Sequence, residues 1–366
     1  MRPADATARE LVQLRDDVRR ANATLPVDPG PATRLAERYF DLAMARGDPR
    51  YIGYADAVVK PLSAVASAPL LVVRAQLQQY RHGFEEALVL FDEALKVDPQ
   101  RASAHAWRGA IYLVQADYAK ADTECNALRE LGRLVLYAAC SGLRSAYTGG
   151  MEAGYSRLQL GAKFAADAET QLWFYTRLGE VAAWRGQASA AEKHYRDALA
   201  LGLDDGYLLA AWADFLLDQK RPQEVVQWLG KWESSDTLLL RLALAETQLQ
   251  LPAAKAHTQA LDDRFAAAKQ RADTTHRAEE ARFWLVLRRD AAQALQVAAA
   301  NYTVQREPRD ARVVLEAALA ARDAAPAQPV RDWLAASKFE DPQLRALAQA
   351  VAALPAKTSA TAKVQP

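Results

Sequence analysis

A recurring spacing of small residues restricts the fold of this sequence more than any other feature. The intervals between Ala75, Ala87 and Phe91 recur about 34 residues further on, at Gly109, Ala121 and Cys125. A period of this length is typical of a repeated pair of antiparallel helices, which buries its apolar face only by stacking on the next pair. We therefore expect an all-α protein that folds as a right-handed α-solenoid of antiparallel helix pairs with an inner groove.

Later segments of the chain continue the same register. The best-preserved unit runs from Leu71 to the closing Pro99. A weaker third unit, a strong fourth and a fifth are marked by Gly142, Gly149, Gly154, Leu158, Leu178, Gly179, Ala182, Gly186, Ala191, Tyr195, Ala198, Trp212, Ala213 and Val225. Small residues stand where helices must approach to about 8–10 Å. The pattern predicts a superhelix like that of tetratricopeptide repeats.

Helical spacing extends to both sides of the clear repeats. We expect an N-terminal helical cap with a divergent first repeat at 1–66, clear repeats at 67–235, divergent C-terminal repeats with a capping helix at 236–354, and a disordered tail at 355–366. The flanking helices are predicted at 4–22, 31–45, 47–62, 236–250, 252–271, 276–288, 290–304, 309–322, 328–337 and 341–354. In the third of these, Asp48 is the expected N-cap and Pro49 the first helical residue.

The charge balance excludes some classes of partner. The chain has 366 residues, with 46 basic and 45 acidic side chains and a net charge of +1. Neither a nucleic-acid partner nor an anionic membrane is favoured by such a balance. No run of about 20 apolar residues predicts membrane insertion. No export leader is evident, so the compartment stays open: periplasmic if Met1 follows a removed leader, and cytoplasmic otherwise.

Cys125 and Cys140 are the two cysteines of the chain. The repeat register places Cys125 on the second helix of one unit and Cys140 on the first helix of the next. Because these helices are neighbours in the stack, a disulfide between them is geometrically possible. Two small buried thiols are the alternative, and the sequence leaves both open.

Catalytic and metal-binding motifs are absent from the sequence. The five histidines form no zinc-binding spacing, and no phosphate-binding loop or nucleophile elbow occurs. We therefore expect a protein that is not an enzyme and has neither metal nor cofactor. The alternative is a small-molecule binder or enzyme centred on His276, Glu279 and Arg282.

The first helix of each repeat is expected to line the inner groove, where three acids recur at successive repeats. These are Glu180, Asp214 and Glu246, and their mutual repulsion requires a positive partner. That partner is either a basic or amide-rich peptide or, within the fold, Arg241 and Arg282. The complete set of groove candidates is Gln76, Trp173, Glu180, Tyr207, Asp214, Glu246, Arg282, Asn301, Gln305 and Arg306.

Four segments carry a resemblance to a known family. They are 47–51 (GDPRY), 214–218 (DFLLD), 276–282 (HRAEEAR) and 301–312 (NYTVQREPRDAR). On these segments the chain resembles a family of bacterial tetratricopeptide repeat proteins of unassigned function. The resemblance implies an export leader, a periplasmic location and hence the disulfide, but it implies no activity. Together with the repeats, it predicts a non-catalytic scaffold or assembly factor that binds a protein or peptide in the concave groove, as a monomer or weak homodimer.

Overall fold

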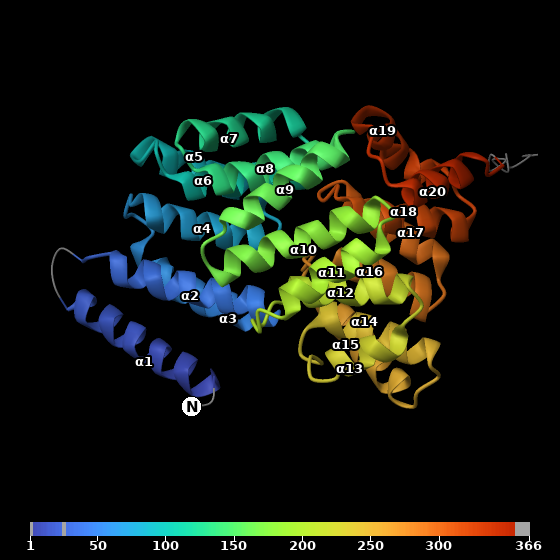
Figure 1. Ribbon diagram of the computed structural model, residues 1–366. Coiled ribbons are helices and arrows are strands. Elements are labelled where there is room, and N and C mark those ends of the chain that lie inside the picture. Colours follow the sequence, from blue (N-terminus) through green and yellow to red (C-terminus); the bar gives the residue numbers. More distant parts are fainter. Residues whose placement is uncertain (1–2, 24–26, 356–366) are drawn as a thin grey trace, which may run out of the picture.

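The described part of the protein is built from helices alone. In the computed structural model, residues 3–23 and 27–355 are described, and these ranges contain no β-strand. The prediction of an all-α, right-handed solenoid of the tetratricopeptide type is confirmed (Figure 1). Apart from Pro355, the tail expected to be disordered lies outside the described residues.

Twenty α-helices follow one another along the described ranges. They are α1 (Pro3–Asn22), α2 (Gly30–Arg46), α3 (Arg50–Val59), α4 (Ala68–Tyr80), α5 (Phe84–Val97), α6 (Ala102–Val114), α7 (Tyr118–Glu130), α8 (Leu134–Tyr147), α9 (Met151–Phe164), α10 (Ala168–Trp184), α11 (Ala188–Leu199), α12 (Gly206–Asp218), α13 (Pro222–Leu229), α14 (Asp236–Gln248), α15 (Ala253–Gln270), α16 (Arg277–Arg282), α17 (Ala291–Tyr302), α18 (Pro308–Ala321), α19 (Gln328–Ser337) and α20 (Pro342–Ala352). Two short 3₁₀ turns, Lys60–Leu62 and Ala325–Ala327, and one π-helical turn, Phe283–Leu287, complete the secondary structure.

Glycines set the distance between paired helices, as the repeat pattern requires. A Cβ atom on Gly154 of α9 would lie 2.5 Å from the carbonyl oxygen of Gly142 and 2.7 Å from the backbone nitrogen of Ala146, both on α8. These two helices therefore touch backbone to backbone. In the next repeat, a Cβ atom on Gly179 would lie 2.7 Å from the ring of Tyr195. The third unit, weak in sequence, is thus as tightly paired as the fourth.

Most of the predicted flanking helices agree with the observed ones to within two residues at each end, and two differ by more. α3 begins at Arg50 rather than Pro49, and the Asp48 carboxylate accepts hydrogen bonds from the Arg50 amide (3.0 Å) and guanidinium (2.6 Å). In place of the single helix predicted at 276–288, α16 ends at Arg282 and the π-helical turn Phe283–Leu287 follows it directly. A π-helical turn inside a helix is rare and is frequent at functional sites.

The superhelix closes on itself, so its inner groove is not open. Late helices pack against the inner side of the early repeats, and Figure 1 shows α19 close to the ends of α8 and α9. Three hydrogen bonds of 2.7 Å join the two parts: the Arg306 amide donates to the Val114 carbonyl, the Trp333 indole to the Tyr118 hydroxyl, and the Met151 amide to the Glu340 carboxylate. The expectation of an accessible concave groove is therefore wrong for this part of the solenoid.

The N-terminal helices also meet later repeats, at the C-terminal end of α2. Gly47 adopts a positive φ of 60°, and a Cβ atom on it would lie 2.5 Å from the hydroxyl oxygen of Ser235. A Cβ atom on Gly206, at the start of α12, would lie 3.3 Å from the carbonyl oxygen of Met44. This contact forms a seam between α2–α4 on one side and α12–α16 on the other.

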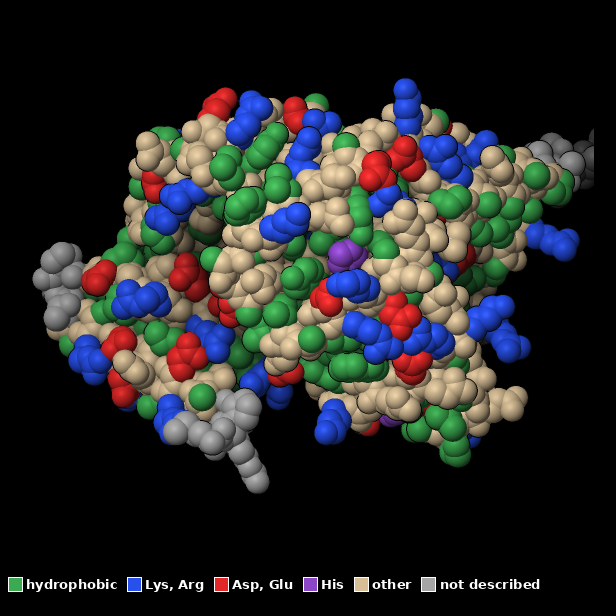
Figure 2. Space-filling model, viewed as in Figure 1, with side chains coloured by type: hydrophobic (Ala, Val, Ile, Leu, Met, Phe, Trp, Pro, Cys, Tyr) green, Lys and Arg blue, Asp and Glu red, His purple; other side chains and the backbone are tan. Residues whose placement is uncertain are grey.

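The surface carries both signs of charge. Figure 2 shows Lys and Arg side chains interspersed with Asp and Glu on the face that is visible, with apolar side chains between them. Within the described ranges, none of the helices combines the length and apolar character needed to span a bilayer.

Candidate functional site

The acid predicted on α10 has partners within the fold. The Glu180 carboxylate accepts hydrogen bonds from Arg177 (2.9 Å) and from the Tyr207 hydroxyl (2.7 Å). The guanidinium of Arg177 also lies over the Tyr207 ring, 4.3 Å from its centroid, and 5.7 Å from that of Trp173. Trp173 and Tyr207, predicted as groove anchors, thus pack around an internal arginine.

Asp214 on α12 is the centre of a second ion-pair cluster. Its carboxylate accepts hydrogen bonds from Arg241 on α14 (2.7 and 3.1 Å) and from Arg282 on α16. Burial opposes ionisation of this carboxyl, but the two guanidinium groups outweigh burial and hold its pKa below the ordinary value. At Asp214 the structure therefore agrees with the internal alternative: Arg241 and Arg282 are the positive partners of this acid.

Glu246 does not lie on the inner surface. The residue is 4% exposed, and its carboxylate accepts a hydrogen bond of 2.7 Å from Nδ1 of His257 on α15. It therefore belongs to the interface between the two helices of its own repeat. Its placement in a stripe of groove acids was wrong, because α14 is buried at every position from Leu238 to Glu246 and turns this side chain toward α15.

The C-terminal candidates also serve the fold. Asn301 is buried and donates to the Asp310 carboxylate at 3.0 Å, and buried Gln305 donates to Nε2 of His82 at 3.2 Å. Neither amide faces a groove, which corrects that prediction. The side chain of Arg306 is exposed, and Gln76 is half-buried on α4.

A largely buried cluster of polar side chains, Glu307, Asp310 and His82, lies between α4, α10 and α18, and the sequence analysis did not predict it. The Glu307 carboxylate is held by Arg309 at 2.8 Å, and these charges keep the Glu307 pKa low despite burial. Burial raises the pKa of neighbouring Asp310 to about 7 and lowers that of His82 to about 4. An E-P-x-D sequence, here a capping box at the start of α18, was the available signal for the Glu307–Asp310 pair.

The alternative catalytic cluster is engaged in the same internal network. The Glu279 carboxylate lies 3.6 Å from Arg241 and 3.9 Å from Nδ1 of His276, while Arg282 binds Asp214. No described group of three or more His, Cys, Asp or Glu side chains is arranged to hold a metal ion. Glu279 and Arg282 therefore join α16 to α14 and α12, and with His276 they do not converge on one reacting atom.

Cys125 and Cys140 form a disulfide between α7 and α8, with Cα atoms 5.5 Å apart. Beside it, buried Glu124 accepts hydrogen bonds from His105 (2.7 Å) and lies 3.0 Å from Arg108. The disulfide thus joins adjacent repeats at the point where their helices stack.

A cleft lies along the seam, and we call it the seam cleft. It has a volume of about 650 Å³, inside the range typical of ligand sites, ~300–1,000 Å³. One wall comes from α3 and the end of α4, with Ile52 and Tyr80. The other comes from α15, the turn after it and the start of α16, with Arg271, His276 and Arg277.

Two arginines of the seam cleft hold no carboxylate in contact. Within the described residues, the side chains of Arg271 and Arg277 form neither a hydrogen bond nor an ion pair at contact distance, although Asp273 of the same lining is near enough for Arg271 to help lower its pKa. Arg264, another lining residue, is by contrast occupied by Asp236 at 2.8 Å. Burial raises the pKa of Tyr80 to about 12, so its hydroxyl stays a donor. The seam cleft therefore offers donors for an anionic group.

Sequence comparisons give no relative for this chain: neither a family model nor a curated protein matches it. Among solved structures, it is similar to the crystal structure of the APC/C hetero-tetramer Cut9–Hcn1, with 13% identity and a TM-score of 0.54 over 90% of this chain. Yeast Tom70 matches 91% of the chain at 16% identity, with a TM-score of 0.42. The chain spans 64% and 62% of the lengths of these two structures. The likeness to the Cut9–Hcn1 structure agrees with a solenoid of the tetratricopeptide type.

Proposed function

We propose that this protein is a non-catalytic scaffold that binds a short acidic segment of a partner protein in the seam cleft. The observation that carries the proposal is the pair of unpartnered guanidinium groups, Arg271 and Arg277, at a cleft large enough for several side chains. Carboxylates form strong, often bidentate hydrogen bonds with guanidinium groups. Ile52 and Phe265 supply apolar surface for the neighbouring side chains of the segment.

The state of the other charged groups supports an acidic partner rather than a basic one. Glu180 and Asp214 already bind arginines. Each acid in the cleft lining also has a donor: Asp236 binds Arg264, Asp273 accepts from the Thr275 amide at 3.0 Å, and Glu280 accepts from the Trp284 indole at 3.2 Å. The fold agrees with a binding role, since stacked helix pairs present extended surfaces to partners. The similar structure of Cut9 was itself solved with Hcn1 in a hetero-tetramer.

The alternative of an enzyme or small-molecule site around His276 has less support. His276 does line the seam cleft, but Glu279 and Arg282 do not. Catalysis by general acid and base requires groups within hydrogen-bond reach of one reacting atom. The Glu279 carboxylate lies 3.9 Å from His276 but also 3.6 Å from Arg241, and Arg282 binds Asp214, so the three side chains do not meet at one atom.

A site-specific photo-crosslink tests the proposal. In one variant, a photoreactive amino acid replaces Thr274, which lines the seam cleft. In a second variant of the same protein, it replaces the exposed Ala166. In lysate from cells that make the protein, we expect a discrete crosslinked protein from position 274 only. The crosslink should be lost in R271Q/R277Q and kept in a control with exposed arginines changed, R133Q/R289Q.

The possible outcomes separate the candidate functions. A crosslink that persists in R271Q/R277Q, or that forms equally from position 166, would contradict the proposed site. A small molecule that copurifies with the wild type, blocks crosslinking and is lost in R271Q/R277Q would support the alternative instead.

A further inference from the structure

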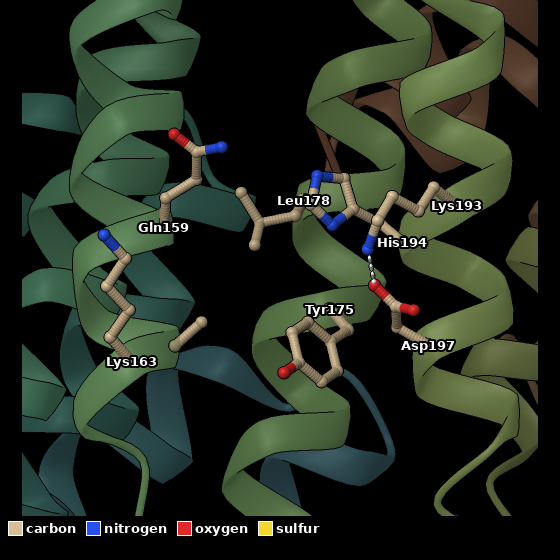
Figure 3. Close-up of a pocket in the computed structure, with 8 residues that line it drawn as sticks. Gln159, Lys163, Tyr175, Leu178, Lys193, His194 and Asp197 are labelled. Carbon is tan, nitrogen blue, oxygen red and sulfur yellow. Dashed lines mark hydrogen bonds and ion pairs between the residues drawn. The ribbon is translucent and has the colours of Figure 1, made fainter.

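A second pocket lies on the outer side of the solenoid, away from the seam cleft. It occupies about 280 Å³ between α9 and α11, the second helices of adjacent repeats. Figure 3 shows Tyr175 and Leu178 of α10 between the two walls. Because ligand pockets have volumes of ~300 Å³ or more, this one has room for one or two side chains rather than for a cofactor.

Two lysines give the rim of this pocket a positive charge. Lys163, in the last turn of α9, is exposed and makes no ion pair with a described residue. Lys193 on α11 donates to Asp197 at 2.6 Å, which leaves two of its N–H groups available (Figure 3). Two cations against one carboxylate make the rim favourable for one further negative charge.

A fixed histidine forms part of the wall. His194 shares a hydrogen bond of 2.6 Å with the Tyr155 hydroxyl through Nε2, which connects α11 to α9. Its Nδ1 is buried and has no hydrogen-bond partner. Buried polar atoms are nearly always paired, so an unpaired one beside a pocket indicates a place where a ligand or ordered water completes the set.

Two exposed apolar side chains lie on the same helix as one wall of the pocket. On α9, Leu160 is 53% exposed and Phe164 is 68% exposed, one helical turn apart and about 100° around the helix from the pocket residues Gln159 and Lys163. Figure 2 shows apolar side chains gathered over the region of α8 and α9. No described element covers either side chain. Because a phenyl ring buries a large apolar area at an interface, Phe164 can contribute to the binding of a partner.

We propose that the outer surface between α9 and α11 is a docking surface for a partner segment in which an acidic residue stands next to a bulky apolar one. The carboxylate enters the pocket between Lys163 and Lys193 and receives charge-assisted hydrogen bonds. The apolar side chain lies over Leu160 and Phe164. An acidic segment is the expected occupant because the rim carries two lysines against one aspartate and the pocket has room for one or two side chains. None of the residues that line this pocket also lines the seam cleft.

A peptide-display selection on the full-length protein tests this docking surface. A random peptide library is selected on the wild type after depletion on K163E, and selected peptides are synthesised for fluorescence anisotropy. Lys96 provides the matched control, because it is also exposed and lies in the last turn of a second helix, α5. K163E should bind selected peptides at least 10-fold more weakly, whereas K96E should bind them like the wild type.

The composition of the selected peptides and their response to other variants complete the test. We expect Asp or Glu next to Leu, Phe or Trp in the peptides, weaker binding by F164S, and weaker binding at high salt. The seam-cleft variant R271Q/R277Q should bind them with unchanged affinity. Failure to enrich any peptide, equal binding by K163E, or loss of binding in R271Q/R277Q would each overturn the proposal.

Discussion

Replacing Asp214 by Asn removes the charge at the centre of the inner ion-pair cluster while it preserves size. In the wild type, the Asp214 carboxylate receives two hydrogen bonds from Arg241 and one from Arg282. Arg241 is 5% exposed, so its charge has little access to water. In D214N the amide oxygen can still accept a hydrogen bond from Arg241, but among the described residues the only remaining negative charge near that guanidinium is Glu279 at 3.6 Å, beside the carbonyls of Thr237 (2.8 Å) and Ala210 (3.3 Å).

The size of the effect follows from these remaining contacts. Removing one partner of a buried ion pair costs about 3–5 kcal/mol. Because Asp214 has a side-chain exposure of 31% and Arg241 retains other acceptors, we expect the lower end, about 3 kcal/mol. With an unfolding entropy of about 2.1 cal/mol/K per residue, a chain of 366 residues should lose roughly 4 °C in Tm.

The stabilising effect of Asp214 should depend on pH. Because the folded-state pKa of Asp214 lies below its unfolded value of about 3.9, its stabilising effect is present above that pH and is lost as the pH falls further. Urea unfolding of wild type and D214N should therefore differ at pH 7, and the difference should shrink progressively as the pH falls below about 4. D204N, at an exposed aspartate whose side chain has no partner among the described residues, is the control. Equal stability of D214N and wild type at pH 7, or a difference that is as large at pH 3 as at pH 7, would contradict the prediction.

Further measurements test other parts of the fold. G154A should destabilise by about 1–3 kcal/mol in denaturant unfolding because its methyl group meets the backbone of α8, whereas G53A, which has no atom within 4 Å of the new methyl, should stabilise slightly. Reducing the Cys125–Cys140 disulfide, or changing both to Ser, should cost about 3 kcal/mol, seen as a lower Tm with reductant. Because the buried Asp310 carboxyl has its pKa raised to about 7, wild type should lose stability relative to D310N as the pH rises from about 4 to 7.

Local sequence signals were sufficient to predict the helices. The expected ranges 236–250 and 328–337 correspond to α14 (Asp236–Gln248) and α19 (Gln328–Ser337), because the helical period and capping residues are local properties of a chain. The π-helical turn at Phe283–Leu287 was not predictable in this way. It depends on how α16 must shift to keep Ala281 and Phe283 in the core, which only tertiary packing determines.

The position of the seam cleft could not be predicted from the same signals. Closure of the superhelix accumulates from the small rotation between each repeat and the next, so the contact of Gly47 with Ser235 has no local signature. Arg271 and Arg277 resemble any solvent-facing arginines in sequence. Glu180 and Asp214 were identifiable as inner-surface acids, but the partners of Asp214 come from α14 and α16, so only the packing of neighbouring repeats determines them.

The location of unpaired charge decides where binding free energy is available. At the inner surface, a ligand carboxylate competing for Arg241 must replace an existing bond to Asp214, so the exchange yields little and exposes the acid to a buried environment without a partner. At Arg271 and Arg277, a ligand carboxylate breaks no ion pair within the described residues, but Arg271 is exposed and Asp273 lies near it, so water and that acid reduce the gain. If the protein has the proposed function, the seam cleft is therefore the surface at which an acidic partner gains affinity, while the charges of Glu180 and Asp214 stabilise the fold.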